Sequence, residues 1–311
     1  MKKIILSLTA VILAAGFACA QDMATATETA KTANDALSIK DYASALTGFQ
    51  QALAEASACG EEGEELVATC KGIIPNIMLN IAKNAIKESK FDDGLKTLAD
   101  AIKTAGEYGA DDVVAEATTL VGQAKKAKAN SLVKAKDYAG AIAAYKEVLE
   151  ADPADGASAL QMGAALNATG DTAGAIAAFE QAMANGQEAT AKKQLANIYL
   201  KDGQALLKEK KFKEAIEACL KSAEYNPSAN AYKLAASAAT QAKDNTNAIA
   251  YYEKYLEVSP DAKDAAAINF TVGALYQQAG NKAKALEFYK KVAGDATYGP
   301  QAKPLIESLS K

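Results

Sequence analysis

One pattern of small and large side chains recurs seven times between Ala45 and Ala285, and it strongly limits what the chain can fold into. Each copy has a small anchor residue, a mostly large residue four positions later and a mostly small residue seven positions later. Those offsets fall on one face of an α-helix. Small residues also stand twelve positions before the anchors, namely Ala33, Ala82, Ala129, Gly163, Gly203, Ala236 and Gly273. The pattern predicts pairs of helices that cross at small residues and stack in an array without a single closed core.

The fourth copy carries the pattern most completely. Gly163 is followed by Leu166, by a turn at Gly170-Asp171, by the anchor Ala175 and by Phe179. This order resembles the tetratricopeptide repeat, although the tryptophan of that family's first helix is missing throughout. The resemblance implies an all-α fold, a right-handed α-solenoid of about seven tetratricopeptide-like helix hairpins with a C-terminal capping helix. It also implies a binding scaffold and not an enzyme.

The spacing of the anchors predicts where the array is irregular. Successive anchors are 49, 47, 34, 40, 33 and 37 residues apart, and the first two intervals exceed the family period of about 34 residues. We expect lengthened helices and longer turns around residues 57–71 and 105–117. The repeat array is predicted to occupy residues 21–293. A capping segment follows at 294–311, where a helix break precedes a short final helix.

The first twenty residues have the pattern of a secretory signal peptide. Lys2 and Lys3 precede a largely apolar run, and the run ends in Ala18-Cys19-Ala20. We therefore expect residues 1–20 to be a signal peptide that is cleaved after Ala20. The mature protein is then expected in the periplasm, without an integral membrane segment. Lipid anchoring at Cys19 is the competing interpretation, but the branched apolar residue usual three positions earlier is replaced by Gly16.

The composition excludes several function classes. His and Trp are absent and so is Arg, so every cationic side chain is a lysine. The formal net charge is −4, which makes nucleic acid an unexpected partner. The sequence lacks the residue patterns of a catalytic triad, a phosphate-binding loop or a metal site. We expect no catalytic residues, no cofactor and no metal.

Cys59 and Cys70 are separated by an acidic, Gly-containing insertion. In an oxidising periplasm they can form a disulfide that closes this loop, and the alternative is two free thiols. Cys219 occupies a place that is large and aromatic in other copies, so we predict a buried small hydrophobe.

The family resemblance also implies which side chains line a concave groove. They stand six and three positions before the small residue of each first helix, and one, four and five positions after it. Five places in each of seven repeats give 35, and none of them is Asp or Glu, although about five acids are expected from the composition. The candidate groove residues are Asn76, Lys83, Lys87, Lys126, Asn130, Lys134, Asn197, Lys208, Asn230 and Lys233.

These residue types favour a protein or extended peptide as the partner. Asn and Gln amides can bind a peptide backbone, and lysines can bind an acidic side chain or a C-terminal carboxylate. The alternative is that acids are missing here by chance or through tight packing. Two other functions stay open, a carrier of a small anionic ligand or glycan fragment and an assembly factor for envelope lipoproteins. Glycans usually stack on exposed aromatics, and Phe270 is the only aromatic among the 35 places.

Overall fold

The computed structural model describes residues 17–311, with side chains from Asp22 onward, and every regular element in that range is helical. The helices are α1 (Phe17–Ser38), α2 (Tyr42–Ala58), α3 (Glu64–Lys87), α4 (Phe91–Tyr108), α5 (Asp111–Lys134), α6 (Tyr138–Ala151), α7 (Gly156–Thr169), α8 (Thr172–Ala182), α9 (Glu188–Lys208), α10 (Phe212–Tyr225), α11 (Ala229–Gln241), α12 (Asn245–Val258), α13 (Ala265–Gln278), α14 (Lys282–Lys291) and α15 (Gly299–Leu309). A 3₁₀ turn, Gly60–Gly63, precedes α3.

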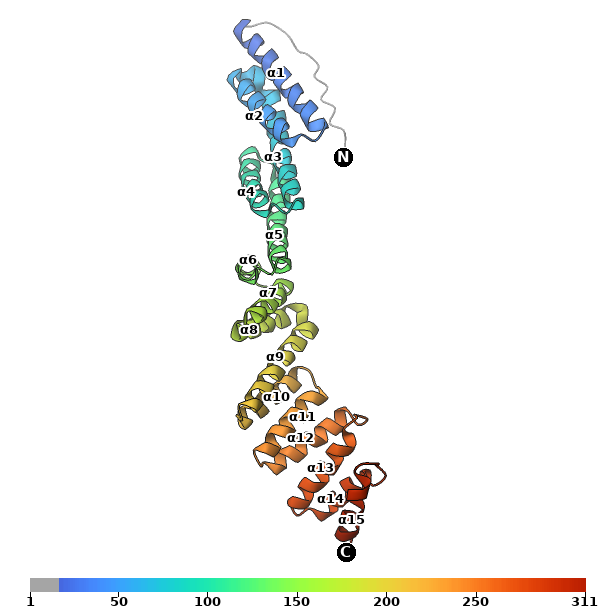
Figure 1. Ribbon diagram of the computed structural model, residues 1–311. Helices are drawn as coiled ribbons and strands as arrows, with labels where there is room; N and C mark the ends of the chain where they lie inside the picture. The colour runs from blue at the N-terminus through green and yellow to red at the C-terminus, as the bar shows by residue number, and fades with distance from the viewer. Residues whose placement is uncertain (1–16) are drawn as a thin grey trace. The chain divides into compact units, whose positions relative to one another are not determined.

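The helices pair in chain order into seven hairpins, as Figure 1 shows for α1 with α2 and for α3 with α4. We call the first helix of each pair the A helix and the second the B helix. The chain divides between Ala151 and Asp152 into two compact units, one holding three hairpins and the other four hairpins with α15. The predicted all-α fold of helix hairpins is confirmed. The right-handed winding stays a prediction.

The A and B helices of a hairpin cross where the sequence places small residues. A Cβ atom on Gly163 of α7 would lie 2.8 Å from the ring of Phe179 on α8, and one on Gly273 of α13 would lie 2.9 Å from the ring of Tyr289 on α14. In α9 the same role falls to Gly203, which packs against the sulfur of Cys219. The helices approach this closely because the small residue leaves room for the large one.

Short, similar turns join A to B within every hairpin. One residue of each turn has a positive φ, and these are Lys40, Ser89, Lys136, Gly170, Lys210, Lys243 and Gly280. An Asp or Asn side chain then caps five of the seven B helices by accepting a backbone N–H, for example Asp171 from Gly174 at 2.9 Å. The two exceptions are α4 and α10, whose N-cap residues Lys90 and Lys211 make no side-chain cap bond.

The extra residues of the first two intervals lie mainly in helices. Both α3 and α5 run for 24 residues, so the predicted lengthening of helices is confirmed. The longer turn expected around residues 105–117 is wrong. Only Gly109 and Ala110 separate α4 from α5, because Gly109 takes the left-handed conformation that ends a helix at once.

Each unit contains separate apolar clusters along its stack. In the first unit Phe49 and Ile74 belong to a cluster that runs from α1 to α4, while Leu98 belongs to another that extends to α5. In the second unit Ala302 of α15 packs against the cluster around Tyr289. This arrangement is typical of repeats that bury their apolar faces against neighbours.

The predicted signal peptide falls almost entirely outside the described residues, and so does the side chain of Cys19. Among the helices that are described, none is both long enough and apolar enough to cross a bilayer.

Candidate peptide-binding surface

All ten candidate residues lie on A helices, four of them on α9 and α11 and the others on α3 and α5, and none is buried. Of the 35 predicted groove places, only Ala30 and Leu79 are buried. We call the accessible part of these 35 places, taken within each unit, the A-helix wall. The A-helix wall is therefore a real surface made of uncharged and cationic side chains.

The wall residues Lys83 and Lys233 form ion pairs with acids that lie about one repeat further along the chain. The Lys83 ammonium on α3 lies 2.7 Å from a carboxylate oxygen of Glu116 on α5, and both side chains are about half exposed. On α11, Lys233 pairs with Asp264, which also accepts a hydrogen bond from the hydroxyl of Tyr255 on α12. Neither acid stands at one of the 35 places, which is why a count over those places misses them.

The Lys83–Glu116 pair also reveals the register between α3 and α5. Its two members are 33 residues apart, whereas the crossing residues Ala82 and Ala129 of the same helices are 47 apart. The difference of 14 residues corresponds to about 21 Å along a helix. The C-terminal half of α5 thus lies well beyond the level of Lys83.

This displacement spreads the four candidate groove lysines of the first unit, Lys83, Lys87, Lys126 and Lys134, along the wall. Lys126 lies ten residues after Glu116 and Lys134 lies eighteen after it, which places them about 15 and 27 Å further along α5. Lys83 and Lys87, one helical turn apart on α3, do stay together. The structure thus brings two of the four lysines to one spot and separates the other two from it.

Tyrosines of the B helices orient amides on the A-helix wall. The hydroxyl of Tyr145 on α6 donates to Asn130 Oδ1 on α5 at 2.6 Å, and that of Tyr289 on α14 donates to Gln277 Oε1 on α13 at 2.9 Å. Each bond occupies the amide oxygen and turns the amide N–H groups toward other acceptors. Both tyrosines stand at the large-residue place of their repeats, so the sequence pattern indicates their packing but not the bond that the hydroxyl donates.

Asn76 uses its amide within its own helix. Its Nδ2 donates to the Gly72 carbonyl at 3.0 Å, next to Pro75, which lacks a backbone N–H. The polar role predicted for Asn76 is therefore partly taken up by α3 itself.

Hydrogen bonds and burial shift the acid–base equilibria in the second unit. Burial, followed by the hydrogen bond to Asp264, raises the pKa of Tyr255 to about 12. The Lys233 ammonium and then the Tyr255 hydroxyl lower the pKa of Asp264. The neutral tyrosine and the charged carboxylate are the forms that this arrangement stabilises.

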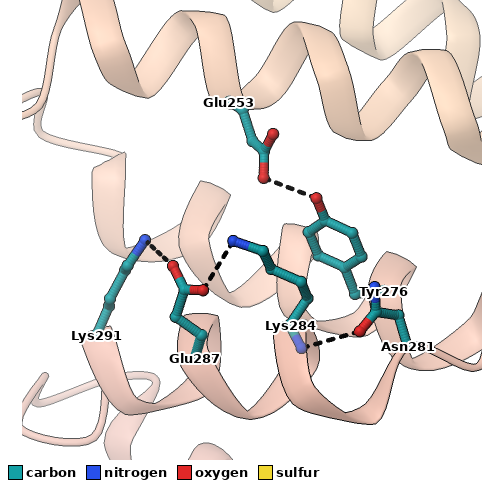
Figure 2. Close-up of polar contacts among 6 residues, drawn as sticks. All are labelled: Glu253, Tyr276, Asn281, Lys284, Glu287 and Lys291. Carbon is teal, nitrogen blue, oxygen red and sulfur yellow. Dashed lines mark hydrogen bonds and ion pairs between the residues drawn. The ribbon is translucent and has the colours of Figure 1, made fainter.

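Acids that are missing from the wall places are present on the B helices. Figure 2 shows Glu287 of α14 between Lys284 and Lys291, at 2.9 and 3.2 Å, and Tyr276 of α13 donating to Glu253 of α12 at 2.8 Å. The B-helix lysines drawn there are thus neutralised within their own helix.

The Cys59–Cys70 bridge is not formed. The Cys59 thiol donates to the Glu55 carbonyl at 3.5 Å, while Cys70 is an unbridged thiol whose pKa is raised to about 11 by burial. Cys59 follows the last residue of α2, whereas Cys70 lies inside α3, and no disulfide joins the two. Cys219 is buried, as predicted.

Within the part of the chain that the structure describes, no three His, Cys, Asp or Glu side chains gather where they could hold a metal ion.

Comparison with known proteins identifies the repeats. Two models of the tetratricopeptide repeat match residues 132–198 and 200–265. Proteins of this family are non-catalytic interaction scaffolds. No curated protein matches the chain.

Solved structures with similarity to the chain include three repeat proteins. Crystalline MamA is 23% identical, with 56% of this chain and 96% of that chain covered and a TM-score of 0.31. MamA from Desulfovibrio magneticus RS-1 is 20% identical, with 56% and 93% covered and a TM-score of 0.30. YrrB, described as a TPR protein with an unusual peptide-binding site, is 21% identical, with 58% and 91% covered and a TM-score of 0.31.

Proposed function

We propose that this chain, which belongs to the tetratricopeptide repeat family, binds an extended acidic segment of a partner protein on its A-helix wall. As a member of that family it is a protein-interaction scaffold. The proposal adds the surface and the chemistry of the partner.

The observation that carries the proposal is the kind of charge found on the A-helix wall. The A-helix wall has lysines and no acid at its 35 places, in a chain with a net charge of −4. Two carboxylates that approach the wall, those of Glu116 and Asp264, are held by Lys83 and Lys233. A partner's carboxylate would meet the same favourable charge, and oriented amides such as Asn130 would offer N–H donors to its backbone.

A glycan is less well suited to the same surface. Phe270 is the one aromatic among the wall places, and its ring packs against Tyr289 and Tyr298 with centroids 5.4 and 5.5 Å away. That ring is used in packing around α15, so it does not offer a free face for sugar stacking.

We also propose export to the periplasm with cleavage after Ala20, from the leader pattern alone. Mass spectrometry of the protein recovered from a periplasmic extract tests this. A mature N-terminus at Gln21 supports it. A lipid-modified N-terminal Cys19 supports the anchor instead.

The binding proposal is tested with two double variants that make the same charge change. Lys87→Glu with Lys134→Glu alters the wall, and Lys103→Glu with Lys146→Glu alters exposed lysines of α4 and α6. The probes are fluorescent peptides of about twelve residues, one with Asp at every third position and one with Asn there. Fluorescence anisotropy should show that the wild-type protein binds the Asp peptide more tightly than the Asn peptide. The wall variant should lose at least fivefold in affinity for the Asp peptide, whereas the variant of α4 and α6 should keep the wild-type affinity. Equal affinity in both variants contradicts the proposal.

A further inference from the structure

We infer that Lys83 and Lys87 form a two-lysine carboxylate subsite on the A-helix wall, and that Glu116 of the next A helix occupies it in competition with the partner. The inference rests on the proposed function and adds the position and regulation of one contact. It predicts that removing an acid from the protein strengthens its binding of an acidic segment.

The helical geometry of α3 places Lys83 and Lys87 next to each other. Lys83 and Lys87 are four residues apart in one helix, so their side chains project from the same face. Lys87 is exposed and forms no ion pair within the described residues. The adjacent Glu88 is engaged elsewhere, since its carboxylate lies 2.8 Å from the Lys90 ammonium. A carboxylate that arrives from solution therefore has one uncompensated ammonium to meet, one turn away from a second.

Glu116 already places a carboxylate on one of these two lysines, Lys83. Its carboxylate oxygen lies 2.7 Å from Lys83 Nζ, within the range of a charge-assisted hydrogen bond. It comes from α5, so it crosses from one A helix to the next along the wall. It shows directly that Lys83 accepts a carboxylate in this position.

The exposure of the pair makes the exchange feasible. The Lys83 side chain is 40% exposed and that of Glu116 is 53% exposed. Ion pairs this exposed are weak, because water competes with both partners. A partner that contributes backbone contacts besides its carboxylate can displace Glu116, whereas an isolated carboxylate in solution gains little over it.

The second unit has a similar ion pair, but its carboxylate is held more firmly. Asp264 pairs with Lys233 and is also held by the Tyr255 hydroxyl. Because two groups fix that carboxylate, its release would leave the buried Tyr255 hydroxyl without an acceptor. The displaceable acid is therefore Glu116, and Asp264 is a structural one.

The test measures binding of the fluorescent Asp peptide to full-length protein. Glu116→Gln keeps the size of the side chain and removes its charge, so affinity should rise two- to fivefold, which is the range set by an exposed ion pair. Lys83→Gln should lower the affinity by a similar factor. In the double variant, Glu116→Gln should bring no gain, because its effect acts through Lys83.

Glu147→Gln is the matched control. Glu147 on α6 pairs with Lys125 of α5 at 3.4 Å, so this variant releases a lysine that is not among the wall places. It should leave the affinity unchanged within twofold. Circular dichroism of each variant checks that the fold is retained.

The outcomes separate this inference from the proposed function. If wild type prefers the Asp peptide but Glu116→Gln does not strengthen binding, the subsite inference is wrong and the wall proposal stands. If wild type does not prefer the Asp peptide, both fail. If Glu147→Gln raises affinity as much as Glu116→Gln does, the effect is net charge, and the specific subsite is refuted.

Discussion

Gly163 of α7 lies against the ring of Phe179 on α8, so closely that a methyl group on Gly163 would be 2.8 Å from two ring carbons. Gly163→Ala should therefore destabilise the second unit. Alanine favours a helix over glycine by about 0.5–1 kcal/mol, but overpacking a buried contact costs about 1–3 kcal/mol. We expect a net loss of about 1–2 kcal/mol in the free energy of unfolding, measured by urea denaturation.

Gly122→Ala is the control for that substitution. Gly122 lies inside α5, is exposed, and nothing is within 4 Å of the position a Cβ atom would take. Only the higher helix propensity of alanine then acts, so the free energy of unfolding should rise by about 0.5–1 kcal/mol. If Gly163→Ala were also stabilising, the crossing of α7 and α8 would be looser than the structure has it.

The same contact explains why the hairpins could be predicted from the sequence. The small residue and the large residue of a crossing, such as Gly163 and Phe179, are separated by a fixed number of positions that helix geometry translates into one contact. The register between successive A helices has no such signal. It depends on how far the inserted residues of α4 and α5 extend each helix, and a single residue, Gly109, ends α4 abruptly.

The hydrogen-bond and ion-pair partners of the wall residues were also less predictable, because they depend on the packing between helices. The exposed positions follow from helical periodicity, and the structure leaves nearly all of them accessible. The acceptor of the Tyr145 hydroxyl and the acid that meets Lys83 lie on other helices, 15 and 33 residues away. Their pairing depends on how those helices pack, which the sequence pattern of one helix does not contain.

The strained turns predict a stabilising substitution. Lys243 is the residue of the α11–α12 turn that takes the left-handed conformation, with a φ of 62°. This conformation costs a residue with a side chain about 1 kcal/mol, whereas glycine adopts it without that cost. Lys243→Gly should raise the free energy of unfolding by about 0.5–1 kcal/mol. The same substitution at Lys146, an exposed residue inside α6, should lower it by about 1 kcal/mol. Chemical denaturation of the two variants side by side tests this, and equal effects would contradict the strain argument.

The missing cap of α10 predicts a second stabilising substitution. Lys211 at its N-cap makes no side-chain cap bond, and its ammonium pairs with the Glu209 carboxylate at 2.7 Å while both side chains stay more than half exposed. Lys211→Asp should increase stability by about 0.5–1 kcal/mol, because a capping carboxylate contributes more than an exposed ion pair, whereas Lys211→Ala loses the pair without gaining a cap and should bring no increase. Conversely, Asp171→Ala removes the cap of α8 and should cost about 1 kcal/mol. Thermal melts would contradict this if the Asp and Ala variants at position 211 were alike.

Two tyrosines predict how the second unit responds to alkali. Burial and then a carboxylate acceptor raise the pKa of both Tyr255 and Tyr276 to about 12, above the ordinary value of 10.0. The acceptors are Asp264 and Glu253 (Figure 2 shows the second). A neutral hydroxyl donates to a carboxylate, whereas an ionised one repels it, so the folded state holds these protons more tightly than the unfolded chain does.

The sign of the pH effect follows from that difference. Below pH 10 both states keep the protons and the stabilisation is complete. Between pH 10 and about 12 the unfolded chain loses them first, so the free energy of unfolding falls as pH rises. Urea denaturation from pH 9 to 12 should show this decline in wild type, and the double variant Tyr255→Phe with Tyr276→Phe should be less stable at pH 9 yet lose less on going to pH 12. Tyr138→Phe, which removes a hydroxyl without a hydrogen bond in the described chain, should keep the wild-type decline; an identical decline in the double variant would show that these two hydroxyls do not cause it.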